Sequence, residues 1–156
     1  MTYAAAPHPA APGASSLSQP LYGASFGQAF ARFWQKYATF SGRASRSEFW
    51  WWYLAHALVV ILIFAFMVIG AIAGMTTDPI TGRTEPGPLI GVGAGLLVLW
   101  QLATLVPTIA ISWRRLHDAN LAGPFWFIGF GFGVGAVALI ILLALPSNPA
   151  GARFDR

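Results

Sequence analysis

The amino-acid sequence predicts an all-α membrane protein with three transmembrane helices preceded by an amphipathic interfacial helix. Of its 156 residues, 56% are hydrophobic and only 9% are charged, and the mean hydropathy is +0.62. Soluble domains carry roughly a quarter charged residues, so this chain has too few to cover a water-facing surface in the usual way. Three stretches without a charged side chain, residues 49–74, 88–112 and 125–145, each reach the roughly 20 residues that a helix needs to cross a bilayer.

The chain begins with a segment that is predicted to be a disordered tail. Residues 1–25 are rich in Ala, Pro, Ser and Gly and carry no charged side chain, so they cannot bury enough apolar surface to offset the entropy of ordering. In residues 26–40 aromatic side chains recur at spacings of three and four, which is typical of an amphipathic helix. Because this helix has basic but no acidic residues, we expect it to lie in the membrane interface; packing on other helices is the alternative.

The membrane domain is predicted to extend over residues 26–145. Pro107, inside the second apolar stretch, is expected to kink that helix. The third apolar stretch is expected to span the bilayer as well, although a re-entrant segment is an alternative that would return the chain to the side it came from. Polar segments separate the three stretches and end the chain; they are residues 41–48, 75–87, 113–124 and the short tail 146–156.

The distribution of basic residues predicts a cytoplasmic N-terminus. Four Lys and Arg residues precede the first predicted span and two lie between the second and third, against one in the first loop and two in the tail. Loops rich in Lys and Arg stay in the cytoplasm, so three spans would leave the C-terminus outside, and a re-entrant third stretch would leave it inside. The interface aromatics gather at the same predicted side; they are Trp50, Trp51, Trp52, Trp113 and Trp126.

Two polar clusters would meet at this cytoplasmic face and supply the candidate binding residues. They consist of Arg43, Arg46 and Glu48 in one segment and of Arg114, Arg115, His117 and Asp118 in the other. Arg114 and Asp118 would be i,i+4 neighbours in a helix and could pair, which leaves Glu48 to Arg115 or Arg46. Two interpretations are open: the arginines bind anionic lipid headgroups or a membrane-protein partner, or ion pairs fix one loop to another.

No other chemistry is predicted for these clusters. No positioned nucleophile accompanies His117 and Asp118, so we predict no catalytic residue and do not expect an enzyme. The chain contains no cysteine, and its three histidines lack a recurring ligand spacing, so we expect no metal and no cofactor. The net charge is +4, but the charges lie between apolar stretches, which favours membrane lipids and not nucleic acid as the partner.

Glycines four residues apart predict close helix packing within one chain or between copies in a homo-oligomer. Small residues at this spacing allow two helix backbones to approach each other. The pairs are Gly70 with Gly74, Gly91 with Gly95, and Gly129 with Gly133.

The sequence favours a structural or interaction role through a basic, aromatic cytoplasmic face. The alternative is a small permease or channel subunit with His56 and Gln101 along its pathway. A continuous polar path between the helices would favour transport, whereas a dry, glycine-lined seam would favour interaction.

Two motifs resemble the domain-of-unknown-function 805 family. The first, Gly-Arg-x-x-Arg-x-Glu-Phe-Trp, occupies Gly42–Trp50 before the first predicted span, and the second, Arg-Arg-Leu-His-Asp, occupies Arg114–Asp118 before the last. The resemblance covers about residues 30–155. It implies a small multi-pass protein of the bacterial inner (plasma) membrane and carries no established activity, substrate or cofactor.

Overall fold

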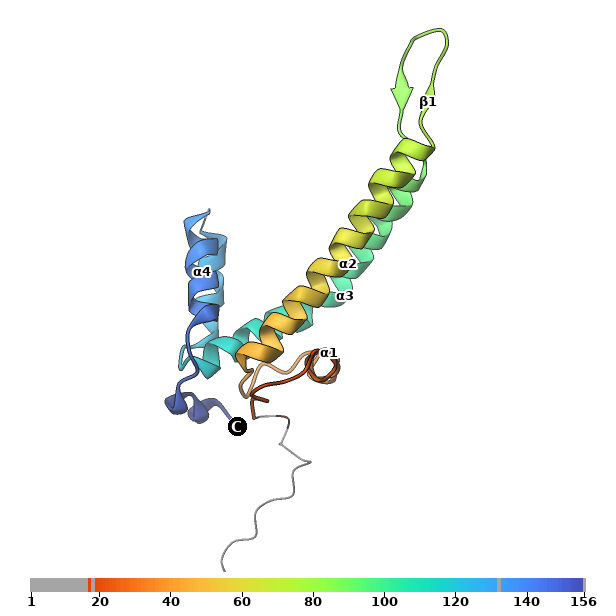
Figure 1. The fold of residues 1–156 in the computed structure, drawn as a ribbon. Helices are drawn as coiled ribbons and strands as arrows, with labels where there is room; N and C mark the ends of the chain where they lie inside the picture. Colours follow the sequence, from red (N-terminus) through yellow and green to blue (C-terminus); the bar gives the residue numbers. More distant parts are fainter. Residues whose placement is uncertain (1–16, 18, 132, 156) are drawn as a thin grey trace, which may run out of the picture.

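The protein has two arms of unequal length that rise from a common base, as Figure 1 shows. The computed structural model describes residue 17, residues 19–131 and residues 133–155. The elements in chain order are α1 (Phe26–Gln35), α2 (Arg46–Ala73), β1 (Thr76–Thr77), β2 (Thr84–Glu85), α3 (Leu89–Asp118), the 3-10 helix η1 (Gly123–Phe130), α4 (Val134–Ala144) and the 3-10 helix η2 (Pro149–Phe154). The chain is therefore mostly helical, as the sequence predicts.

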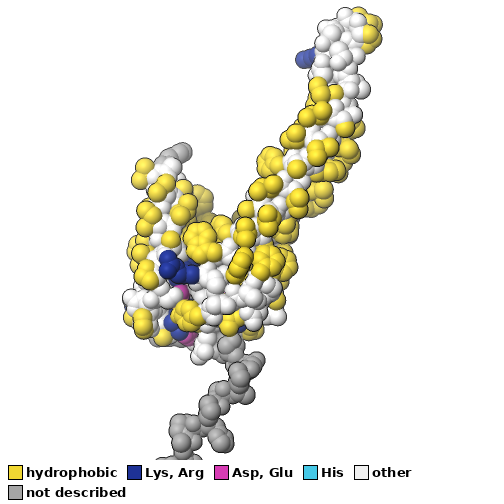
Figure 2. All heavy atoms as spheres, viewed as in Figure 1, with side chains coloured by type: hydrophobic (Ala, Val, Ile, Leu, Met, Phe, Trp, Pro, Cys, Tyr) yellow, Lys and Arg dark blue, Asp and Glu magenta, His cyan; other side chains and the backbone are white. Residues whose placement is uncertain are grey.

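The long arm consists of α2 and α3, which run antiparallel and are joined at the far end by the β1–β2 hairpin (Figure 1). At 1.5 Å per residue, the 28 residues of α2 and the 30 of α3 extend about 42 and 45 Å, more than the roughly 30 Å of a bilayer core. By length and composition, both helices can cross a membrane. Figure 2 shows hydrophobic side chains over the outside of both arms.

The helix boundaries differ from the predicted ones in a way that matters for the motifs. A capping box starts α2 at Arg46, because the Ser45 hydroxyl accepts from the Glu48 N–H while the Glu48 carboxylate accepts from the Ser45 N–H. At the other end of the arm, α3 continues past residue 112 to Asp118. It bends in its C-terminal half (Figure 1), where Pro107 removes a backbone hydrogen bond, as predicted.

The seam between α2 and α3 is closed by glycine. A Cβ added to Gly74 would lie 2.8 Å from the Gly87 Cα, and one added to Gly70 would lie 2.5 Å from the Leu89 Cβ. The predicted pair Gly70 and Gly74 thus lies at a close backbone approach. On α3, however, Gly93 faces α2.

The prediction of a close contact at Gly91 and Gly95 is wrong for this seam. Their added Cβ atoms would meet nothing within 4 Å, whereas one at Gly93 would collide with Met67. Residues that are two positions apart lie on nearly opposite sides of a helix, so Gly91 and Gly95 face outward when Gly93 faces α2.

The third apolar stretch forms a helical hairpin and not the predicted single helix over residues 125–145. Here η1 and α4 pack along each other as the short arm, and the chain reverses between them (Figure 1). The eight residues of η1 and the 11 of α4 each extend about 16 Å, half of a bilayer core. The physical reason is glycine, which costs about 1 kcal/mol in a helix interior relative to alanine and tolerates reversal of the chain.

The glycines of the short arm serve the turn and not a helix face. Gly133 has a φ of +63°, and an added Cβ at Gly135 would collide with the Ile128 carbonyl. Gly129 lies in η1 and faces Leu139 of α4, whereas Gly133 lies between the two helices. The prediction that Gly129 and Gly133 form a pair on one helix is therefore wrong.

The N-terminal helix α1 lies across the base of the long arm, seen end-on in Figure 1 while α2 runs lengthwise. It buries Ala29, Arg32 and Phe33, and it keeps Phe26 and Phe30 exposed. Packing on α2 thus accounts for one side of the helix. The helix ends at Gln35, five residues before the predicted end.

Residues 19–25 of the predicted tail are docked against the base. The Leu21 N–H donates to Glu48, the Ala24 N–H donates to Ser47, and Ser25 caps α1. The rest of that predicted tail, apart from residue 17, lies outside the described residues.

The α2–α3 seam predicts different effects on stability for Gly→Ala at Gly74, which faces the seam, and at Gly91, which faces outward. Gly74→Ala places a methyl group against backbone, so we expect it to lower the free energy of unfolding by about 1–3 kcal/mol. Gly91→Ala points to open space and should cost nothing. Unfolding of both variants in detergent micelles is the measurement, and equal effects would contradict the described seam.

Candidate functional site

The candidate site is a cluster of buried charged side chains at the base of the two arms. Backbone hydrogen bonds bring its segments together: the Ala44 N–H donates to the Arg114 carbonyl (3.0 Å), and the Gly42 N–H donates to the Phe154 carbonyl (2.8 Å). We call this cluster the basal core; its charged and titratable members are Arg32, Lys36, Arg43, Glu48, Arg114, Arg115, His117, Asp118 and Asp155.

The Asp118 carboxylate accepts hydrogen bonds from three segments of the basal core. It accepts from Arg115 Nη1 (2.8 Å), from the Ser147 hydroxyl (2.5 Å) and from the Tyr22 hydroxyl (3.0 Å). Its side chain and that of Arg115 are completely buried. One carboxylate therefore joins the N-terminal segment, the end of α3 and the C-terminal tail.

Arg115 also connects α3 to the end of α4. Its Nε donates to the Leu143 carbonyl (3.0 Å), and its Nη2 donates to the Leu145 carbonyl. The predicted pair of Arg114 with Asp118 is therefore wrong: the pair uses Arg115, at i,i+3, while Arg114 Nε donates to the Ala110 carbonyl (3.2 Å). Positions i,i+3 and i,i+4 are both neighbours on a helix surface, so spacing alone does not choose between the two arginines; Arg115 is the one that also reaches the carbonyl groups at the end of α4.

Glu48 forms its ion pair with Arg32. The predicted pairing of Glu48 with Arg115 or Arg46 is therefore wrong. Arg32 Nε donates to Glu48 Oε1 (2.5 Å), and the other oxygen accepts from the backbone N–H groups of Leu21 (3.0 Å) and Ser45 (2.9 Å). The Glu48 side chain is only 3% exposed. It therefore anchors α1 and the segment before it to the start of α2.

The C-terminal tail is held by Arg43 and His117. Arg43 Nε and Nη2 donate to the two Asp155 oxygens at 2.9 and 2.6 Å, and these hydrogen bonds raise the pKa of Arg43. The His117 ring hydrogen-bonds through Nδ1 to the Gly42 carbonyl (3.0 Å) and stacks on Phe154 at 4.1 Å. Both predicted site residues thus fix loop to tail.

Arg46 is the exposed member of the seven predicted polar site residues. Its Nη2 donates to the Ala144 carbonyl (2.5 Å), and it makes no ion pair with any carboxylate of the described residues. The other six lie in the basal core. Their arrangement agrees with the interpretation in which ion pairs fix loops, and it leaves Arg46 free to meet a ligand.

Two cations of the basal core have incomplete hydrogen bonding. Lys36 is 1% exposed at the C-terminal end of α1, and neither its Nζ nor Arg114 Nη2 has a hydrogen-bond partner among the described residues. Burial, helped by the nearby positive charges of Arg114 and Arg32, lowers the pKa of Lys36 to about 8. Lys36 is not among the predicted site residues, although its spacing from Ala29 and Arg32 places it on the buried stripe of α1.

The predicted interface tryptophans divide into two groups. Trp50 and Trp51 are exposed, whereas Trp52 is 1% exposed and stacks on Phe33 of α1. Trp113 and Trp126 are half-buried. The interface prediction is wrong for Trp52, since three consecutive helical residues spread over about 200° and one of them had to face α1.

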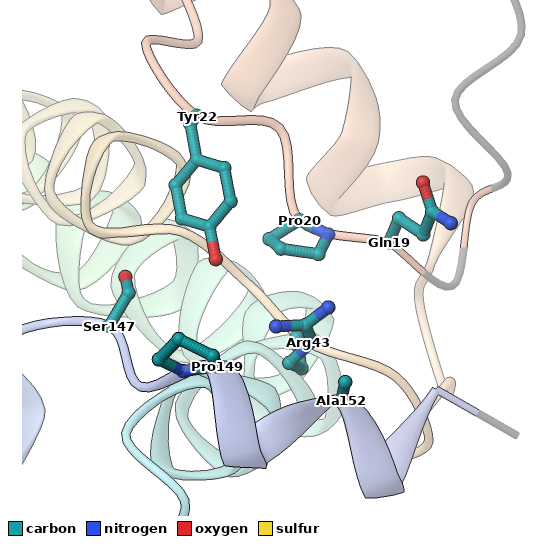
Figure 3. A pocket seen from close by; sticks show the side chains of 7 residues that line it. All are labelled: Gln19, Pro20, Tyr22, Arg43, Ser147, Pro149 and Ala152. Carbon is teal, nitrogen blue, oxygen red and sulfur yellow. The ribbon is translucent and has the colours of Figure 1, made fainter.

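A polar pocket of about 560 Å³ opens on the surface of the basal core. Figure 3 shows the polar ends of Tyr22, Arg43 and Ser147 converging on it from three segments of the chain. All three already donate to the carboxylates of Asp118 and Asp155. These donors are therefore already used within the ion-pair network and are not available to bind an anionic ligand in the pocket. Sequence spacing gives no signal for Tyr22 or Asp155, because their partners lie 96 and 112 residues away.

Comparison with known proteins identifies a family and relatives that are named as inner membrane proteins. The family model described as "Protein of unknown function (DUF805)" matches residues 37–156. Two curated relatives, both named inner membrane protein YhaI and found in Escherichia coli K12 and O157:H7, are 28% identical over 120 residues, which cover 77% of this chain and 86% of each relative. No solved structure matches the chain. The segment that supplies Tyr22, Arg32 and Lys36 precedes the matched residues.

Removing the charge of Asp118 tests whether the basal core holds the fold together. Asp118→Asn would leave Arg115 buried without a counter-charge, so we expect a loss of about 3–5 kcal/mol in unfolding free energy. Glu85→Gln is the control, because Glu85 and Arg83 form an exposed pair 3.9 Å apart that contributes less than about 1 kcal/mol. Chemical unfolding in detergent micelles measures both, and similar losses would contradict the assignment.

Lys36 makes stability depend on pH. Its pKa is about 8 in the folded protein and 10.5 ordinarily, so between these values the unfolded chain binds more protons and stability rises with pH. Between pH 7 and pH 9.5 the rise should be about 2 kcal/mol in wild type relative to Lys36→Met, which has no proton to lose. Unfolding at pH 7 and pH 9.5 checks this; an identical pH dependence in both proteins would contradict it.

Proposed function

Since this chain belongs to the DUF805 family, we propose that it is an inner-membrane protein whose cytoplasmic base works by contact with anionic lipid headgroups. The observation that carries the proposal is a group of exposed aromatic residues on α1, on the loop after it and at the start of α2, which we call the aromatic collar. The collar consists of Phe26, Phe30, Tyr37, Phe40, Trp50 and Trp51, each 38–44% exposed. Trp and Tyr rings favour the membrane–water interface, and Phe is typical of the apolar face of an interfacial helix, so the arrangement supports a base held at headgroup level with α1 lying along the membrane surface.

The proposed topology has two spanning helices and a re-entrant hairpin, with both termini in the cytoplasm. Each half of the short arm extends about half the bilayer core, and the chain returns to the basal core, where the Asn148 N–H donates to the Asp118 carbonyl (2.7 Å). In this arrangement eight of the nine Lys and Arg residues of the sequence are cytoplasmic, and Arg83 is on the other side. Three spans would leave only six inside, so the positive-inside rule supports the hairpin.

The seam between α2 and α3 favours a contact role over a permease or channel. Among the described residues, the two polar side chains that the transport alternative needs do not line a shared path: the His56 Nδ1 accepts from the Trp100 indole N–H (3.2 Å), and Gln101 is exposed on the outside of α3. A pore needs a polar stripe along its helices. Gly70, Gly74 and Gly93 instead bring the two backbones together without room for water.

Retained lipid tests the proposed function. We expect protein purified from vesicles of equal phosphatidylglycerol and phosphatidylethanolamine, and washed in detergent, to retain phosphatidylglycerol in several-fold excess. The physical reason is the net positive charge at the headgroup level of the base. Lipid extraction with mass spectrometry is the measurement. Retained lipid with the composition of the bulk vesicles would contradict the proposal.

Cysteine labelling tests the topology cleanly, because the native chain contains no cysteine. Ile80→Cys lies at the exposed tip of the β1–β2 hairpin, and Ala150→Cys lies in the exposed tail. In intact spheroplasts an impermeant maleimide should label Ile80→Cys only, and after lysis it should label both. Labelling of Ala150→Cys in intact spheroplasts would instead support three spanning helices.

A further inference from the structure

Two apolar grooves run along α2 on either side of Trp50. The inner groove, about 280 Å³, lies between the arms and is lined mainly by Phe49, Trp50 and Tyr53 of α2 and by Leu139, Ile140 and Leu143 of α4 and its end. The outer groove, about 310 Å³, is lined by Arg46, Ser47, Trp50, Trp51 and Leu54. Trp50 is the wall that the two grooves share.

Arg46 stands at the cytoplasmic end of both grooves. It lies one helical turn before Trp50, lines the outer groove itself, and donates to the carbonyl of Ala144, which follows Leu143 of the inner groove. A guanidinium has five N–H donors, and this contact uses one of them. Figure 2 shows basic side chains at the base of the gap between the arms, bordered by hydrophobic ones.

The chain itself offers no carboxylate to Arg46. Its five acidic residues divide into Glu48, Asp118 and Asp155, which are paired in the basal core, and two at the opposite end of the long arm, Asp78 and Glu85. A second copy in the same membrane orientation would therefore bring no counter-charge to this level. The exposed arginine and the apolar walls beside it instead match a molecule with an anionic head and hydrocarbon chains.

We propose that Arg46 and the two grooves bind one diacyl phospholipid with an anionic headgroup from the cytoplasmic leaflet. The phosphate lies on the Arg46 guanidinium, and one acyl chain follows each groove, so that Trp50 separates the two chains. Each groove is near the lower volume limit of small-molecule sites, about 300 Å³, which suits a hydrocarbon chain better than a bulky solute. This inference rests on the proposed contact role and gives it a defined site and ligand.

Native mass spectrometry of the full chain in detergent, titrated with phosphatidylglycerol, phosphatidylcholine and single-chain lysophosphatidylglycerol, tests the proposal. Wild type should bind one phosphatidylglycerol, at least about tenfold more tightly than either other lipid. Arg46→Ala should lose about tenfold in affinity, the expected effect of removing a charge-assisted contact, and Arg46→Lys should lose less. Ala136→Phe, which fills the inner groove, should weaken binding with the arginine intact.

Arg153→Ala is the matched control, since Arg153 is also exposed at the base but lies outside both grooves. Its phosphatidylglycerol affinity should equal that of wild type, and thermal unfolding verifies that each variant is folded. Equal weakening by Arg46→Ala and Arg153→Ala would overturn the site, as would unchanged binding in Arg46→Ala or in folded Ala136→Phe. Those results leave the contact role standing if wild type still prefers the anionic lipid; loss of that preference in wild type overturns both proposals.

Discussion

The buried Asp118 carboxylate holds the two arms of this protein together. It binds the N-terminal segment through Tyr22, the C-terminal tail through Ser147 and the end of α3 through Arg115. Arg115 in turn holds the carbonyl groups where α4 ends. A carboxylate and a guanidinium that are removed from water this completely require full hydrogen bonding, and the site provides it from four separate parts of the chain.

The same network compensates part of the positive charge of the base. Arg32, Arg43 and Arg115 each have a carboxylate partner inside the protein. Among the described residues of the base, Arg46 and Arg153 are the basic residues that remain exposed. Lys36 and Arg114 are two buried cations of the basal core with unsatisfied hydrogen-bond donors. The desolvation of Lys36 is an energetic cost that the fold tolerates at this point.

Hydropathy predicts α2 and α3, because a helix must be apolar over the length that crosses the bilayer core, and helix periodicity predicts α1 from the spacing of its aromatic residues. They fail at residues 125–145, where composition still satisfies the membrane but the glycines near 131 let the chain turn back. Helix spacing leaves some details open, such as whether Arg114 at i,i+4 or Arg115 at i,i+3 pairs with Asp118. The pair of Arg43 and Asp155, 112 residues apart, has no local signal at all.

A double-mutant cycle on the buried pair of Arg115 and Asp118 tests most directly whether this ion pair holds the fold together. Arg115→Met, Asp118→Asn and the combined variant are unfolded chemically in the same detergent, and the coupling free energy is taken from the four stabilities. We expect the double variant to lose less than the sum of the single losses, by about 1–3 kcal/mol, because one substitution removes the charge that the other leaves unpaired. Additive losses would contradict it.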